Sequence, residues 1–236
     1  MVDRAAQRAL LAGGDIDVAG RMPWSSNATF LVNVGCGDET AQAIYKPTRG
    51  ERPLWDFEPG LHRRELAAYH LSEAMGLDLV PPTVIRDGPL GEGSLQWFVD
   101  ADHREHYFTI AEQRPELHPQ LRDIAVLDIV ANNTDRKSGH CLLAGDRVWA
   151  IDNGLCFAPE FKLRTVIWEF AGDALTPGQL EAVAMVCRGV PPEVAGRLIV
   201  LGFLGEVLER IPVVGLRSHL RECLADKLDH ADTDLL

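Results

Sequence analysis

The sequence is poor in cysteine and in cationic side chains, and it has no long apolar run. Its 236 residues include five cysteines, which are widely spaced and form no CxxC or CxxH pair. We therefore expect no zinc site of that kind and a reducing, cytoplasmic compartment. No stretch approaches about 18 uninterrupted apolar residues, so a membrane-spanning helix is not expected. The N-terminal segment also lacks the apolar core of a signal peptide.

Cationic side chains are outnumbered by acidic ones. There are 23 Lys plus Arg against 35 Asp plus Glu, which gives a formal net charge of −12. This excess disfavours nucleic acid and anionic membrane surfaces as partners, because both are bound largely through Lys and Arg. An anionic nucleotide would need a local site that is cationic or filled by a metal. The length allows one bilobal domain or two small domains.

The first part of the chain has the pattern of a small antiparallel sheet with one long helix. Two β-rich runs surround a glycine-containing turn at 35–38, which is a hairpin signal. Pro47 closes the second run, since proline cannot donate to a strand ladder. The ranges expected are a short helix at 4–12, strands at 28–34 and 40–46, a helix at 61–76, and strands at 82–86 and 94–100.

The second part is expected to be mainly helical. A helix at 121–132 is followed by the polar loop 133–140, and a short hairpin joins 141–144 to 147–151 around Gly145 and Asp146. Thr176 and Pro177 are a typical helix start. The remaining helices expected are 176–188, 192–204 and 215–229.

Three polar side chains are expected at one end of this hairpin. If Gly145 and Asp146 form its loop, paired residue numbers sum to 291, so His140 faces Ile151 and lies at the same end as Asp152. Asp135 lies in the loop that leads to that end. A carboxylate and an imidazole are suitable ligands for Mg²⁺ or Mn²⁺. The alternative is that Asp135 and Asp152 are ordinary turn acids that bond the local backbone.

Lys46 and Glu65 form a second candidate constellation. Lys46 ends an apolar strand, and Glu65 borders the apolar stripe of the following helix. A pair between them would satisfy both charges and place the lysine for contact with phosphate oxygens. The alternatives are an exposed edge lysine and a glutamate that pairs with Arg63 or Arg64.

The turn before the first strand of the hairpin is a weaker candidate. Ser25, Ser26 and Asn27 are small polar residues whose backbone N–H groups can face an anion, although an ordinary strand-entry turn explains them as well. Arg136 and Lys137 flank Asp135, and each is either a phosphate contact or a loop cation without that role.

These motifs resemble those of atypical kinases. NTDRKSGH (133–140) and AIDNGLCF (150–157) resemble the NTDR and IDNGLAF segments of type II phosphatidylinositol 4-kinases, and 65–84 resembles a helix and strand of Fam20 kinases. The order of parts is that of protein-kinase-like phosphotransferases, although HRD and DFG are absent, as in the branch that includes HipA-type kinases. Over nearly the whole chain the sequence resembles the SCO1664-like actinobacterial family, related to phosphatidylinositol 3- and 4-kinases. The shared segments are SSNATFLV, AIYKP, QWFVDADHREHYFT, NNTDRK and KLRTVIWEFAG.

The resemblance implies a role for each matching residue. Lys46 becomes the phosphate-contacting lysine, Glu65 its partner or a metal helper, Asp135 the catalytic aspartate and Asp152 a metal ligand. His140 departs from the pattern, because related kinases place a metal-binding asparagine five residues after the catalytic aspartate. The adenine edge is expected to meet the backbone of Gln96, Trp97, Phe98 and Val99.

We therefore predict an α+β, bilobal, protein-kinase-like fold. A nucleotide-binding lobe is expected at 1–101 and a mainly helical catalytic lobe at 102–236. The predicted activity is ATP-dependent transfer of the γ-phosphoryl group to a hydroxyl of a protein or small molecule, with Mg²⁺ or Mn²⁺. The alternative is a nucleotide-binding pseudokinase that acts through partners, since His140 stands at the asparagine position. The acceptor, the metal and the oligomeric state are left open.

Overall fold

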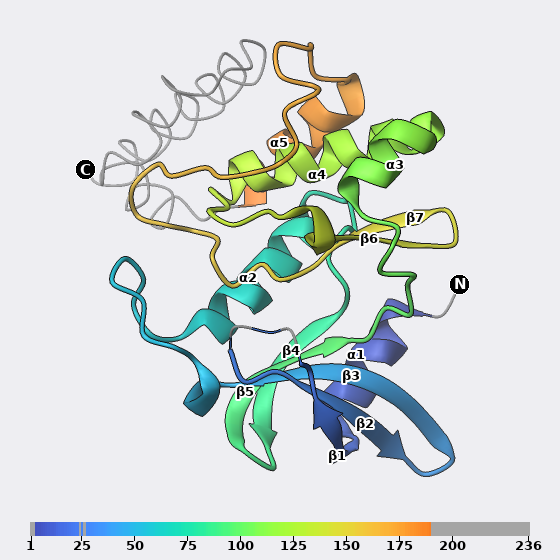
Figure 1. Ribbon diagram of the computed structural model, residues 1–236, viewed down its shortest axis with the longest axis vertical. Coiled ribbons are helices and arrows are strands. Elements are labelled where there is room, and N and C mark those ends of the chain that lie inside the picture. The colour runs from blue at the N-terminus through green and yellow to red at the C-terminus, as the bar shows by residue number, and fades with distance from the viewer. Residues whose placement is uncertain (1–2, 24, 26, 190–236) are drawn as a thin grey trace, which may run out of the picture.

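A five-stranded antiparallel sheet forms one side of the molecule, and most helices lie on the other side (Figure 1). The computed structural model describes residues 3–23, 25 and 27–189, so the helices expected at 192–204 and 215–229 lie outside the described residues. The strand order is β1-β2-β3-β5-β4. The strands are β1 (Asp15–Arg21), β2 (Phe30–Cys36), β3 (Glu39–Pro47), β4 (Thr83–Gly88) and β5 (Gly91–Trp97).

The hairpin of β2 and β3 is present, and its turn is tighter than expected. Cys36 pairs with Glu39, which leaves only Gly37 and Asp38 in the loop. Gly37 has φ 61°, a backbone conformation that glycine adopts without the steric cost of a side chain. In the second hairpin, β5 begins at Gly91 and ends at Trp97, so residues 98–100 are not in the strand.

β1 is a strand that the sequence pattern did not indicate. All but one of its residues are exposed, and it contains two aspartates and a glycine, so it lacks the apolar alternation of a half-buried strand. It forms because it pairs antiparallel with the free edge of β2, with an irregular register between Val18 and Gly20. The strand is therefore held by its ladder rather than by buried side chains.

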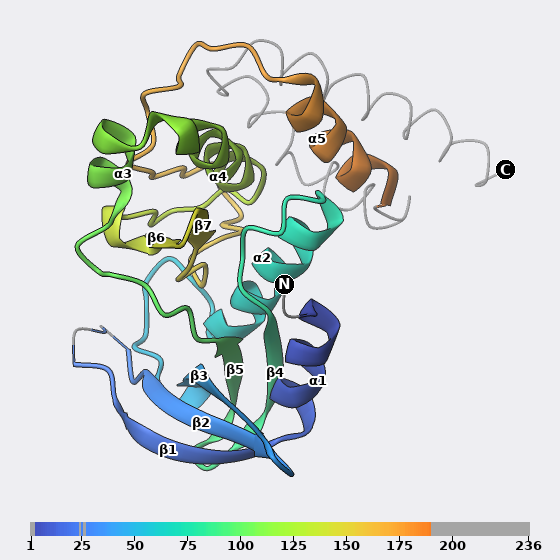
Figure 2. The ribbon, with the colours of Figure 1, turned by 90° about the vertical axis from the view of Figure 1, so that its right-hand side faces the viewer.

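Two helices of the first part pack near the sheet. α1 (Arg4–Gly13) is capped by Asp3, whose side chain accepts a hydrogen bond from the Ala5 N–H. α2 (Leu61–Ala74) lies between the sheet and the later helices (Figure 2). Glu65 and Tyr69 are buried on this helix, so α2 contributes both a charged and an aromatic side chain to the interior.

The later half contains α3 (Tyr107–Gln113), α4 (His118–Val130), the hairpin β6 (Cys141–Ala144) and β7 (Arg147–Ala150), and α5 (Pro177–Gly189). Short 3-10 helices span Thr48–Gly50, Pro115–Leu117 and Ser138–His140. The hairpin has the expected register, since Cys141 pairs with Ala150, and the Ile151 N–H donates to the His140 carbonyl (3.0 Å). At the start of α5, Thr176 and Gln179 exchange hydrogen bonds between side chain and backbone, as in a capping box.

The largest apolar cluster joins α2 to the later elements. It includes Tyr69 of α2, Tyr107 of α3, and Leu121, Ile124 and Leu127 of α4. A smaller cluster lies under the sheet, between α1 and strands β2, β3 and β5. The division into lobes at 1–101 and 102–236 stays a prediction. Within the described ranges, none of the helices combines the length and apolar character that a membrane crossing requires.

Candidate active site

Lys46 and Glu65 form the expected ion pair. Lys46 stands near the end of β3 and Glu65 in the second turn of α2, and the lysine Nζ contacts Glu65 Oε1. Glu65 is only 3% exposed. Its second oxygen, Oε2, accepts a hydrogen bond from the Asn153 N–H (3.1 Å). Glu65 therefore joins the strand lysine to the chain just after Asp152.

Asp152 lies between Lys46 and His140. Its Oδ1 is 2.7 Å from Lys46 Nζ, and its Oδ2 is 3.3 Å from His140 Nε2. The convergence of His140 and Asp152 that the hairpin register predicts is therefore confirmed. Asp152 has φ 56°, in the left-handed region that few residues with side chains adopt. Such conformations are often found at functional loops, where the surroundings hold them in place.

The charges of this group shift one another's pKa values. Burial lowers the pKa of Lys46, but Asp152 and Glu65 outweigh that effect and hold it above its ordinary value. The Lys46 ammonium keeps the pKa of Asp152 below its usual range, against the effect of burial. Burial lowers the pKa of His140, although Asp152 opposes this effect. The arrangement therefore favours a charged lysine, an ionised aspartate and a neutral histidine.

Lys46, Glu65 and Asp152 line a cleft, and Asp135 lies on the wall of the same cleft. Asp135 is held through its backbone. Its N–H donates to Asn133 Oδ1 (3.0 Å), and its Oδ2 is 2.8 Å from Lys137 Nζ. The Asp135 side chain is 31% exposed and Lys137 is well exposed. Asp135 thus has a fixed main chain, a carboxylate that solvent can reach, and a neighbouring cation.

The turn before β2 contributes to the cleft. Ser25 and Asn27 line it, whereas Ser26 lies outside the described residues. Ser25 Oγ is 2.7 Å from Thr29 Oγ1, and Asn27 Oδ1 accepts a hydrogen bond from the Arg52 N–H (3.0 Å). The complete lining is Ser25, Asn27, Ala28, Thr29, Lys46, Pro47, Glu51, Arg52, Leu54, Leu61, His62, Glu65, Asp135, Asp152, Gly154 and Leu155.

The segment expected to meet adenine is not part of this lining. The Trp97 N–H donates to the Pro82 carbonyl (2.8 Å), and the Phe98 N–H donates to the Gln42 carbonyl (3.1 Å). Gln96 is buried and belongs to β5, a strand with a neighbour on each side. Val99 lies beyond the strand end. An adenine contact at 96–99 therefore stays a prediction.

Arg136 is not an exposed loop cation. It is 2% exposed, and its guanidinium bonds Asp128 (Nη2 to Oδ1, 2.8 Å), which is 1% exposed. Burial lowers the pKa of Arg136, but the charge of Asp128 outweighs that effect and raises it above the ordinary value. Asp128 occupies the apolar face of α4, four residues after Ile124 and seven after Leu121. That position is the sequence signal for a buried pair, because an ionised acid in a core needs a partner.

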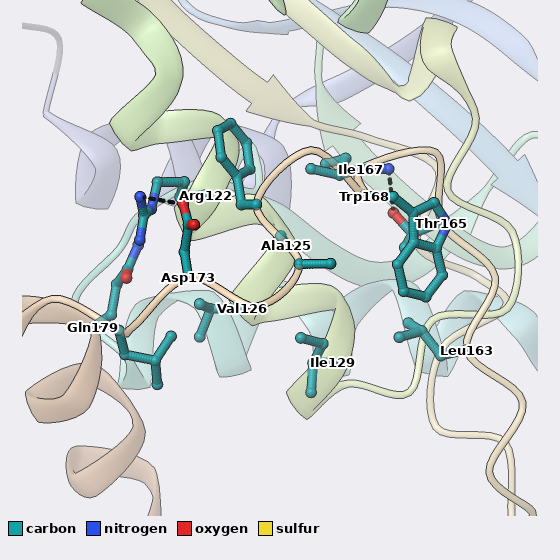
Figure 3. Close-up of a pocket in the computed structure, with 13 residues that line it drawn as sticks. Arg122, Ala125, Val126, Ile129, Leu163, Thr165, Ile167, Trp168, Asp173 and Gln179 are labelled. Carbon is teal, nitrogen blue, oxygen red and sulfur yellow. Dashed lines mark hydrogen bonds and ion pairs between the residues drawn. The ribbon is translucent and has the colours of Figure 1, made fainter. Parts of the chain in front are cut away.

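A second pocket, which is mainly apolar, shares no lining residue with the cleft of Lys46, Asp135 and Asp152. Figure 3 shows its lining. It lies between α4 and the chain at 163–175, and its two charged lining residues, Arg122 and Asp173, pair with each other (3.0 Å). Trp168 lines this pocket and is 50% exposed. Phe170, which also lines it, packs against the large core cluster. The pocket brings together no set of free ionisable groups.

The donor set beside the cleft fits a divalent ion that takes most of its ligands from elsewhere. Within the part of the chain that the structure describes, no three or more His, Cys, Asp or Glu side chains are grouped to hold a metal. Asp152 and His140 supply one carboxylate and one imidazole. Mg²⁺ is often bound in this way, by one or two carboxylates together with substrate phosphates and water.

Comparison with solved structures identifies the fold. The crystal structure of the Golgi casein kinase superposes with a TM-score of 0.52 at 16% sequence identity, covering 97% of this chain and 74% of that one. The same kinase with Mn/ADP bound gives a TM-score of 0.52 and covers 97% and 75%. This likeness shows the fold, which is α+β and kinase-like, as predicted.

Sequence comparison adds two relatives, whereas no protein-family model matches the chain. Phosphatidylinositol 4-kinase gamma 4 of Oryza sativa subsp. japonica is 30% identical over 52% of this chain and 25% of its own length. Protein Rv2133c of Mycobacterium tuberculosis is 40% identical, and the match covers 78% of each chain. At that identity and coverage, the chain belongs to the same family as the mycobacterial protein Rv2133c.

Proposed function

We propose that the chain is an ATP-dependent phosphotransferase, which moves the γ-phosphoryl group to a hydroxyl of a protein or small molecule. The observation that carries this proposal is the meeting of Lys46, Asp135 and Asp152 at one cleft, with Lys46 held by buried Glu65. The kinase-like fold and the match to a plant phosphatidylinositol 4-kinase support it. The shared segments quoted above also support membership of the SCO1664-like group.

The charge of the cleft supports a requirement for a divalent metal. Two cationic side chains line it, Lys46 and Arg52, against four acidic ones. A triphosphate entering such a cleft meets a net negative wall, so an added cation is needed to offset the repulsion. In this proposal Asp152 and His140 hold Mg²⁺ or Mn²⁺. The bound ion supplies neutralisation of charge on the phosphate oxygens.

The protein's own residues have distinct parts in the proposed reaction. A bond forms between the acceptor hydroxyl oxygen and the γ-phosphorus, while the bond from that phosphorus to the bridging oxygen breaks and its electron pair leaves with ADP. Asp135 orients the hydroxyl and accepts its proton, and Lys46 offsets charge on the phosphates. Because Lys46 contacts Asp152 in this structure, the lysine must exchange part of that contact for a phosphate oxygen.

His140 favours a second candidate function, a nucleotide-binding module without turnover. The Lys137 N–H donates to His140 Nδ1 (3.4 Å), so the ring proton of the neutral imidazole lies on Nε2, facing Asp152. Binding of a metal through Nε2 therefore requires the other tautomer. An asparagine would present a carbonyl oxygen without such a change. This difference would slow or abolish turnover while leaving nucleotide binding in place.

One experiment separates the two functions. The full chain is incubated with γ-labelled ATP and Mg²⁺, Mn²⁺ or EDTA, and phosphate release, autophosphorylation and the thermal shift caused by nucleotide are measured. We expect metal-dependent turnover that falls about 10²- to 10⁴-fold in Asp135→Ala, with the thermal shift retained. Turnover that survives Asp135→Ala in the folded protein contradicts the assignment. A thermal shift without turnover in the unaltered protein favours the nucleotide-binding module. The absence of both a thermal shift and turnover refutes both functions.

A further inference from the structure

Four buried polar side chains lie behind the cleft and connect the two loops that carry Asp135 and Asp152. They are Asp128 of α4, Asn133 and Arg136 on either side of Asp135, and Asn153 next to Asp152. Their exposures are 1%, 0%, 2% and 1%, so none contacts solvent to a significant extent. A buried polar group normally requires a hydrogen-bond partner, and these four supply partners to one another.

One branch of this network leads to Asp135. Asn133 Nδ2 donates to Asp128 Oδ1 (2.8 Å), and Asn133 Oδ1 accepts the Asp135 N–H (3.0 Å). Both ends of the amide side chain are therefore used, one toward the helix and one toward the candidate catalytic residue. Through Asn133, the position of the Asp135 main chain depends on α4.

The other branch leads to Asp152. Arg136 donates to the Ile151 carbonyl (Nη1, 2.7 Å) and to Asn153 Oδ1 (Nη2, 2.7 Å), so it holds the residues on both sides of Asp152. Asn153 also donates through its N–H to Glu65 Oε2 (3.1 Å). The left-handed conformation of Asp152 is thus flanked by fixed neighbours on each side.

A third contact joins the same network to the chain at 165. Thr165 Oγ1 lies 3.3 Å from Asp128 Oδ2, and Thr165 is at one end of the apolar pocket (Figure 3). Buried ion pairs contribute little net stability compared with apolar side chains of similar volume. Stability alone therefore does not account for a fully buried Asp128–Arg136 pair whose neighbours lead to both acidic loops.

We propose that Asn133 and Asn153 are positioning residues, which transmit the geometry of the Asp128–Arg136 pair to Asp135 and Asp152 respectively. The inference rests on the proposed function for its kinetic consequence, although its structural part does not. Asn133 fixes the residue that orients the acceptor, and Asn153 fixes the residue that would hold the metal. A displacement of about 1 Å in such groups is enough to cost about 10²-fold in rate.

The test compares Asn133→Ala and Asn153→Ala with Ser72→Ala. Ser72 is a matched control, because it is fully buried and its Oγ accepts the Leu79 N–H (2.7 Å), outside the network. Three measurements are made on the full chain: kinetic constants for phosphotransfer, Mn²⁺ binding with ADP by electron paramagnetic resonance, and amide hydrogen exchange. If Asn133→Ala or Asn153→Ala does not fold, Asn133→Ser or Asn153→Ser replaces it.

The two variants are expected to differ in kind. Asn133→Ala should lower kcat about 10²-fold and speed exchange at the Asp135 amide, with the Kd for Mn²⁺ within about twofold of the unaltered protein. Asn153→Ala should raise that Kd about tenfold or more and speed exchange at 151–154. Ser72→Ala should lower the melting temperature without either change.

Two results would overturn the inference. One is that both asparagine variants behave like Ser72→Ala, with a lower melting temperature but unaltered kinetics, Mn²⁺ binding and local exchange. The other is that the two variants are indistinguishable from each other in every readout. If the unaltered chain shows no turnover, the proposed function fails, yet hydrogen exchange and Mn²⁺ binding still decide whether the two asparagines position these loops.

Discussion

Replacing Glu65 tests how far the buried ion pair stabilises the fold. The Glu65 side chain is 4% exposed, contacts Lys46 through one oxygen and accepts the Asn153 N–H through the other. Glutamine has nearly the same shape and keeps an oxygen for Asn153, but it removes the charge that faces Lys46. Alanine removes both contacts and leaves a void.

The expected magnitudes follow from what each variant leaves behind. After Glu65→Gln, Lys46 still has Asp152 at 2.7 Å and a side chain that is 22% exposed. The cost should therefore be below the roughly 3–5 kcal/mol of breaking a fully buried pair, at about 1–2 kcal/mol. Glu65→Ala also leaves the Asn153 N–H without its acceptor, so it should reach about 3–5 kcal/mol.

Urea unfolding measures both variants, because the midpoint shifts while the slope m stays constant if only stability changes. Glu181→Gln is the control, since it breaks an ion pair with Arg188 whose side chains are 62% and 61% exposed. That change should alter the free energy of unfolding by less than about 0.5 kcal/mol. If both Glu65 variants also stay within that limit, or if glutamine costs as much as alanine, the reasoning is refuted.

Three further outcomes are expected. Gly93→Ala should lower the free energy of unfolding in urea by about 1–3 kcal/mol, since an added Cβ would lie 2.7 Å from the Pro47 Cα. Gly20→Ala is the control and should not have this cost, because an added Cβ there has nothing within 4 Å. Equal costs for the two variants would contradict this prediction. Iodoacetamide should label exposed Cys36 in the folded chain but reach Cys141 only on unfolding, because burial raises the pKa of the Cys141 thiol to about 12. Mass spectrometry of early samples measures the order of labelling, and labelling of Cys141 before Cys36 would contradict the prediction. ADP should raise the melting temperature with Mn²⁺ but not with EDTA. An equal rise in both would contradict the proposal that the acidic cleft needs a divalent metal to bind a nucleotide.

The sequence predicts those parts of the site that depend on local periodicity. The register of β6 and β7 follows from a two-residue loop, and it places His140 beside Asp152. A strand end and a helix stripe made Lys46 and Glu65 candidates for a pair, and the structure shows their contact. In the hairpin, a repeat of fixed length determines which side chains can meet, so counting residues is enough. For Lys46 and Glu65 the repeat places each residue on its own element, but it does not determine that the two elements meet.

Elements that depend on distant partners were missed. β1 has no apolar alternation and exists through its ladder with β2. α3 has only seven residues, too few for a clear helical period, and it is held by the burial of Tyr107 and Ile110. Neither contribution can be read from the segment itself, because the stabilising groups belong to other parts of the chain.

Arg136 and Lys137 are neighbours in the sequence but differ in burial. The two cations are adjacent and look alike in the sequence, yet Arg136 is buried and Lys137 is exposed. Asp128 makes the difference, because it stands on the apolar face of α4 and its charge requires a cation. The rule that identified Glu65, an acid beside an apolar stripe, applies to Asp128 without change. In a chain with a net charge of −12, most acids are solvated, so the few that interrupt an apolar stripe are the ones that locate buried cations.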